Sequence, residues 1–183
     1  MNPALLIIDM QNDYFPGGRM ELVEIGKAAD NACRLLELFR AKAYPVIHVQ
    51  HYSVGEDAPF FLPNTKGVEI YPSLTPDSDE LLITKNYPSS FRETELLREL
   101  QNRNISELII CGAMSHMCID TTVRAAFDLG LRSTVAADGC ATRDLTFDGL
   151  TIEAAQVHGA FMAALASVFA TVTQTSEVRN TLV

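Results

Sequence analysis

Tryptophan is absent from this 183-residue chain, and only four cysteines are present: Cys33, Cys111, Cys118 and Cys140. None of them forms a Cys-x-x-Cys pair, and four thiols are few for a disulfide framework in a domain of this size. We therefore expect reduced cysteines that serve either packing or chemistry. Each thiol must then be judged by its position in the fold.

Long uncharged hydrophobic runs are also missing, since no stretch reaches the eighteen or so apolar residues of a membrane span. The chain starts with MNPALLIIDM, which has neither a basic region nor a small-residue cleavage site. We therefore expect a cytoplasmic protein without a membrane partner.

Basic residues are outnumbered: 14 Lys and Arg stand against 23 Asp and Glu, which gives a formal net charge of −9. Such a field repels phosphates and anionic surfaces, so nucleic acid is excluded as a natural partner and a small molecule is the better expectation. A chain of this length with 48% hydrophobic residues can bury one sizeable core. We predict a single domain over residues 1–183.

Short apolar runs alternate with segments of helical period, a pattern typical of a parallel sheet covered by helices on both faces. The predicted strands are Ala4–Asp9, Pro45–Gln50, Leu81–Lys85, Leu108–Cys111, Ser133–Ala137 and Ala170–Gln174. The predicted helices lie near Ile25–Arg40, Thr94–Arg103, Cys118–Leu129 and Thr151–Val168. The fold class is α/β: a three-layer α/β/α sandwich with a mostly parallel, doubly wound, Rossmann-like sheet of about six strands.

The segment from His51 to Asp79 interrupts this alternation with four prolines and several aromatic residues. We interpret it as a long ordered loop. A loop of this length in a compact domain serves either as a lid or binding wall, or as a contact between subunits. The sequence favours neither use.

Reactive side chains end three of the predicted strands or follow them directly. Asp9 closes one apolar strand, Lys85 closes another, and Cys118 follows LIICGAMSHM at the predicted start of a helix. Ligands bind beyond the carboxyl ends of parallel strands, so these three side chains are candidates for one site. An acid that caps a turn, a surface lysine and a buried cysteine are the alternative interpretations.

Cys118 is the candidate nucleophile, because a helix N-terminus and a nearby lysine both favour a thiolate. Free backbone N–H groups in the preceding turn could receive an oxyanion. Cys33 and Cys111 are interpreted as packing residues, whereas Cys140 stays undecided.

Four histidines offer weaker signals. His48 and His51 stand three apart in a predicted strand and so point to opposite faces, and no Asp-x-His element accompanies them, so we expect no metal. His116 is a minor candidate for a base, and His158 lies on an apolar helix stripe as a core or interface residue.

Three separated segments carry a resemblance: LLIIDMQNDYFPGG, ITKNYPSSFRETEL and CGAMSHMCIDTTVRAAFDLG. In this order they resemble the motifs of the isochorismatase-like cysteine hydrolases of the isochorismatase/nicotinamidase superfamily, and the later VAADGCATRD and VHGAFMAALA also fit. The resemblance implies a triad of Asp9, Lys85 and Cys118. It also implies a cis peptide between Ala113 and Met114, with the amides of Met114 and Cys118 forming an oxyanion hole. A homo-oligomer, dimer or tetramer, is implied as well.

The resemblance also bears on the chemistry. HVQHYSVGED lacks the Asp-x-His element with which the nicotinamidase branch binds a metal, so we expect neither that metal nor another cofactor. By resemblance, isochorismatases that cleave a vinyl ether do not need the cysteine, so a retained Cys118 favours hydrolysis of a small amide or related C–N bond through a covalent thioester. Metal-free vinyl-ether hydrolysis by Asp9 alone and a catalytically silent assembly or binding protein remain the alternatives.

The substrate wall is the least specific prediction. Apolar contacts are assigned to Phe15, Phe60, Leu62 and Tyr87, and a polar contact to Asn86. Phe61 and Arg92 are further candidates. Each of these side chains could equally pack in the core or in a subunit interface.

Overall fold

The computed structural model describes residues 3–55 and 57–182. Six strands form one parallel sheet in the order β3-β2-β1-β4-β5-β8. They are β1 (Ala4–Ile8), β2 (Val46–His51), β3 (Leu81–Lys85), β4 (Glu107–Ala113), β5 (Arg132–Ala141) and β8 (Thr171–Thr173). The predicted α/β fold with a doubly wound sheet is confirmed.

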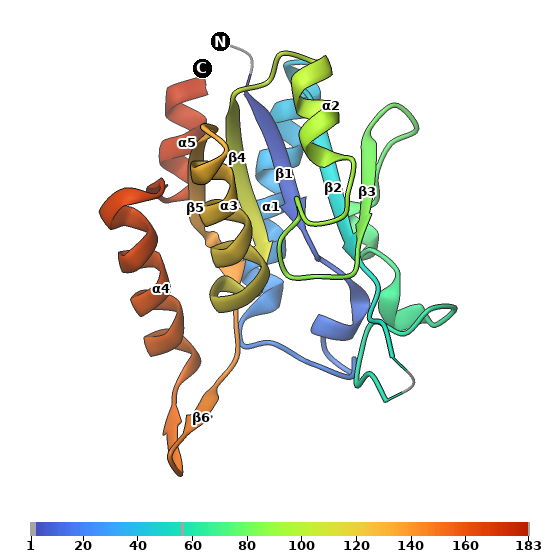
Figure 1. Cartoon of the computed structure of the whole chain (residues 1–183), viewed down its shortest axis with the longest axis vertical. Helices are drawn as coiled ribbons and strands as arrows, with labels where there is room; N and C mark the ends of the chain where they lie inside the picture. Colours follow the sequence, from blue (N-terminus) through green and yellow to red (C-terminus); the bar gives the residue numbers. More distant parts are fainter. Residues whose placement is uncertain (1–2, 56, 183) are drawn as a thin grey trace.

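Helices cover both faces of this sheet (Figure 1). They are α1 (Ile25–Ala41), α2 (Leu96–Asn102), α3 (Asp120–Asp128), α4 (Ala154–Val168) and α5 (Thr175–Leu182). The apolar residues of α1 and α5 belong to one core cluster, and those of α2, α3 and α4 belong to the other. Among the described residues, none of the helices combines the length and the apolar character required to span a membrane.

The central strand β1 shows why the sheet is buried on both faces. All five of its residues, ALLII, are buried. Leu5 and Ile7 pack into the core beneath α1, whereas Leu6 and Ile8 pack beneath α2 and α3. Because side chains alternate along a strand, a continuous apolar run supplies both cores at once.

Shorter elements complete the chain. Three 3-10 helices are η1 (Asn12–Tyr14), η2 (Lys66–Val68) and η3 (Pro72–Leu74), and a π-helical turn, η4, spans Ser115–Ile119. An antiparallel hairpin of β6 (Leu145–Phe147) and β7 (Leu150–Ile152) projects from the body of the molecule ahead of α4 (Figure 1).

Two predicted helices begin later than expected. The helix predicted over Thr151–Val168 starts at Ala154, because Thr151 and Ile152 pair with β6. The helix predicted from Cys118 starts at Asp120, and Cys118 itself lies in the π-helical turn. Strand β5 also continues four residues beyond the predicted end at Ala137. The remaining predicted bounds lie within two residues of those in the structure, and strand Leu81–Lys85 is exact.

The long loop after β2 packs against the domain, and side chains from the turn after β1 hold it. The carboxylate of Asp13 accepts a hydrogen bond from the Phe61 amide at 2.6 Å, and Gln11 donates to the carbonyl of Val68 at 2.7 Å. A Cβ on Gly67 would overlap the Asp13 carboxylate, so only glycine permits this approach. The segment MQNDY therefore fixes the loop that leads away from the end of β2.

Candidate active site

The sheet brings the three predicted strand-end residues together. Asp9 directly follows β1, Lys85 ends β3, and Cys118 lies in the turn after β4. Close packing of β4 against β1 depends on Gly112, because a Cβ there would lie 2.0 Å from the Ile8 carbonyl oxygen. The turn that carries Cys118 therefore lies beside the end of β1.

Asp9 is fully buried at the point where the chain leaves the sheet. Its amide still donates to Val49 in β2 at 3.0 Å, and its φ of 53° places the residue in the left-handed region. Aspartate tolerates this conformation better than most residues, although it carries strain. The carboxylate lies 2.7 Å from the ammonium of Lys85, and neither of its oxygens makes a further hydrogen bond within the described chain.

Lys85 lies at the centre of the site. Its Nζ is 2.7 Å from Asp9 Oδ2, 2.8 Å from His51 Nδ1, 3.1 Å from the Tyr87 carbonyl oxygen and 3.3 Å from Cys118 Sγ. Burial alone would lower the pKa of Lys85, but the charges of Asp9 and Cys118 outweigh burial and raise it. Lys85 is therefore a buried ammonium that contacts both the acid and the thiol.

Cys118 does not meet the expectation of an activated thiolate at rest. Burial raises the pKa of its thiol, and the carboxylate of Asp9 raises it further, while Lys85 opposes both effects. Cys118 is buried in a π-helical turn and does not lie at the N-terminus of a regular α-helix, as the sequence had predicted. Burial and Asp9 thus favour the thiol over the thiolate, so a base beside the sulfur is needed to remove its proton before attack.

The turn before Cys118 contains the cis peptide that the resemblance implies, and the oxyanion hole stays a prediction. The peptide bond between Ala113 and Met114 is cis. Two amides close the turn on the Met114 carbonyl, those of Met117 at 3.0 Å and Ile119 at 3.2 Å. The amides of Met114 and Cys118 take no part in these two hydrogen bonds.

A metal does not fit the site while Lys85 occupies it. One ligand atom each from Asp9, His51 and Cys118 lie within 4.8 Å of one another, a set that could hold an ion. Nζ of Lys85, however, lies within 3.3 Å of all three residues. Zinc ligands lie about 2.0–2.3 Å from the ion, so an ion among these atoms would overlap the ammonium.

Two residues near the triad escaped the sequence analysis. His51 was considered only as a metal ligand, yet its ring accepts a hydrogen bond from Lys85. Tyr14 is buried, and burial raises the pKa of its phenol, as do the nearby Cys118 and Asp9. The tyrosine ends the MQNDY segment that directly follows Asp9, and this proximity in the sequence was the available signal.

The predicted substrate wall is only partly gathered at the triad. Phe15 packs in the core, stacked on Tyr71 with ring centroids 3.5 Å apart. Tyr87 contacts Lys85 through its carbonyl, and the guanidinium of Arg92 lies 3.6 Å above its ring. The remaining predicted members are the half-buried Phe60 and Leu62 and the exposed Asn86, whose amide donates to the Tyr52 carbonyl.

The comparison with known families covers nearly the whole chain. The family model described as the isochorismatase domain matches residues 3–177. The chain belongs to the isochorismatase family. This membership confirms the resemblance carried by the three sequence segments, because the match spans all of them.

Relatives of this isochorismatase-family protein match over most of its length. It is 51% identical to the isochorismatase family protein YddQ of Bacillus subtilis, covering 96% of this chain and 97% of that one. A streptothricin hydrolase of Streptomyces noursei is 30% identical over 78% of this chain and 50% of its own. The crystal structure of an isochorismatase hydrolase from Oleispira antarctica superposes with a TM-score of 0.94 at 46% identity, covering 98% of this chain and 96% of that one.

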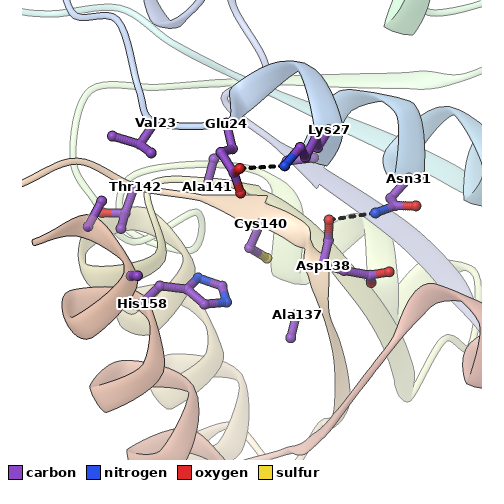
Figure 2. A pocket seen from close by; sticks show the side chains of 13 residues that line it. Val23, Glu24, Lys27, Asn31, Ala137, Asp138, Cys140, Ala141, Thr142 and His158 are labelled. Atoms are coloured by element: carbon purple, nitrogen blue, oxygen red, sulfur yellow. Dashed lines mark hydrogen bonds and ion pairs between the residues drawn. The ribbon is translucent and has the colours of Figure 1, made fainter.

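A separate cavity of about 550 Å³ opens between α1, β5 and α4 of this isochorismatase-family protein (Figure 2). Cys140 and His158 line it, but the triad does not. Burial raises the pKa of Cys140 to about 12, which disfavours its thiolate. Nδ1 of His158 lies 2.8 Å from Oγ of Ser115, which belongs to the π-helical turn that carries Cys118. The cavity wall therefore contacts this turn through His158.

His116 is not placed as a base for Cys118. Its Nδ1 lies 2.6 Å from Thr142 Oγ1, and burial lowers the pKa of its ring. The side chain therefore joins the turn to the end of β5.

Proposed function

We propose that this protein hydrolyses a small-molecule amide or a related C–N bond through a covalent thioester on Cys118. The observation that carries the proposal is the contact of one buried ammonium with both a carboxylate and a thiol, at 2.7 and 3.3 Å. Membership of a hydrolase family supports hydrolysis as the reaction class.

The first half of the reaction forms the thioester. Asp9 takes the proton of Cys118, and the sulfur attacks the carbonyl carbon of the substrate. Lys85 stabilises the charge that passes between the two groups, because its ammonium contacts both. The amides of Met114 and Cys118 would stabilise the oxyanion. The amine then leaves with the proton that Asp9 had taken.

The second half releases the acid. Asp9 removes a proton from water, the hydroxide attacks the thioester carbonyl, and the thiolate leaves and recovers a proton. The proton returns to the thiolate from Asp9, so the buried carboxylate acts twice as a base and twice as an acid, and the enzyme returns to its starting state. The raised pKa of Cys118 supports a role for Asp9 as the base that removes the thiol proton.

Turnover of a panel of small primary and secondary amides, followed by amine release, tests the proposal. We expect Cys118→Ala to abolish release while the far-UV circular dichroism spectrum stays native. Full release by this variant would contradict the covalent route. Cleavage of an isochorismate-like vinyl ether by Cys118→Ala, with no amide hydrolysed by the wild type, would support Asp9-only chemistry instead.

A further inference from the structure

His51 has a place in the site that neither the triad nor the family membership assigns. It ends β2 and pairs with Lys85 in β3 in the register of the parallel ladder. Side chains at paired positions project from the same face of a sheet, so the imidazole and the ammonium meet at the sheet edge. Their distance, 2.8 Å between Nδ1 and Nζ, is that of a short hydrogen bond.

The backbone of His51 is fixed from one side by a single glutamine. Gln11 donates through Nε2 to the His51 carbonyl at 2.9 Å, and its Oε1 accepts the His51 amide at 2.7 Å. The ring of Phe61 lies next to the imidazole, with centroids 5.8 Å apart. The imidazole is therefore held in place before any substrate binds.

The hydrogen bond dictates the protonation state of the ring. An ammonium has three donors and no acceptor, so the nitrogen that faces it must carry a lone pair. Nδ1 therefore carries no proton, and the neutral ring has its proton on Nε2. Burial and the charge of Lys85 lower the pKa of His51 to about 4, while Asp9 acts in the opposite direction, which agrees with a neutral ring.

We propose that His51 is a positioning residue that holds the ammonium of Lys85 between Asp9 and Cys118. This inference rests on the proposed function. The imidazole accepts from one Nζ proton and so directs the other two toward the remaining acceptors. Lys85 is thereby kept where it contacts the carboxylate and the sulfur at once.

Two substitutions separate this role from simple packing. His51→Leu removes the acceptor, and we expect kcat on an amide substrate to fall about 10- to 100-fold with little change in KM, as for other residues that orient a catalytic group. His51→Gln retains an acceptor oxygen and should restore most of that loss. His48→Gln is the matched control, because His48 lies in the same strand but bonds to Glu80, 2.8 Å away. An equal loss in His51→Gln and His51→Leu would contradict the proposal.

Nitrogen-15 NMR of the histidine side chains tests the same inference without any substrate. Four histidines contribute signals, and His51→Gln identifies the one to follow. We expect a neutral ring protonated on Nε2 at pH 7, which takes up a proton only near pH 4. A ring protonated on Nδ1, or one that titrates near pH 6.5, would overturn the inference. Failure of the amide panel alone would leave this NMR result unaffected, so the two proposals can be separated.

Discussion

At the scale of single residues, the buried ammonium of Lys85 is central, because it contacts the carboxylate of Asp9 at 2.7 Å and the sulfur of Cys118 at 3.3 Å. The sequence alone predicted that one site contains Asp9, Lys85 and Cys118, because the carboxyl ends of parallel strands share one edge of the sheet. The raised pKa of Cys118 could not be predicted, since it depends on burial and on the distance to Asp9. His51 was set aside because a search for metal-ligand spacing does not detect a histidine that accepts from a lysine.

The buried ion pair gives a stability prediction that is independent of catalysis. Lys85→Met leaves the Asp9 carboxylate buried without a counter-charge, and we expect the free energy of unfolding to fall by about 3 kcal/mol or more. The double variant Asp9→Asn/Lys85→Met should recover at least half of that loss, because the unpaired charge is gone. Urea denaturation of both variants at pH 7 measures the difference. A double variant that is no more stable than Lys85→Met would show that the pair is not coupled.

At the scale of elements, short apolar, β-rich runs predicted all six strands of the main sheet, whereas the β6–β7 hairpin was missed. Each of its strands has three residues and most of its side chains are exposed, so neither length nor apolar periodicity marks it. The π-helical turn was missed for a related reason, because its hydrogen bonds depend on the backbone geometry after β4 rather than on a sequence pattern.

The Glu80 carboxylate contacts α1, β2 and the loop before β3, and these contacts give a prediction on how the stability of the fold depends on pH. Its carboxylate accepts from Arg40 of α1 at 2.7 and 2.8 Å, from His48 of β2 at 2.8 Å and from the Asp77 amide at 2.9 Å. Burial alone would raise the pKa of Glu80, but these donors lower it to about 2. A depressed carboxylate pKa stabilises the fold above the ordinary value of 4.5, and this contribution is lost as pH falls toward about 2.

We therefore expect Glu80→Gln to lower the free energy of unfolding by about 2 kcal/mol at pH 7, a discounted value for a partly exposed group. The difference from the wild type should shrink as pH falls from 4.5 toward 2. The exposed Glu37 of α1 supplies the control variant, Glu37→Gln, which should cost little at any pH. A loss of unfolding free energy in Glu80→Gln that stays constant with pH would contradict a lowered pKa of Glu80.

At the scale of the whole molecule, the sequence predicts a doubly wound sheet but not what its outer surface contacts. The homo-oligomer implied by the resemblance stays a prediction. Helix α4 contains no Asp, Glu, Lys or Arg, although much of its surface is exposed. Ahead of it, the hairpin exposes Phe147 and Leu150 at 77% and 72%. For a chain with a net charge of −9, an uncharged apolar surface is where two copies repel each other least.

Light scattering during size-exclusion chromatography measures this directly. We expect the wild type to have the mass of a dimer or tetramer of the 20.1 kDa chain. Combining Phe147→Glu with Leu150→Glu should shift the mass toward 20.1 kDa. Leu82→Glu, at an exposed apolar position of β3, is the control and should leave the mass unchanged. A monomeric wild type would refute the expected oligomer.

The central claim is that Cys118 carries the acyl group of the substrate during turnover. The most direct measurement mixes the wild type with the amide that gives the fastest amine release, quenches with acid within milliseconds to seconds, and determines the mass of the peptide that contains Cys118. The account predicts an added mass equal to the acyl group, removed by hydroxylamine and absent from Cys118→Ala. Efficient turnover with no acylated Cys118 at any quench time, and with the amine still released by Cys118→Ala, would contradict it.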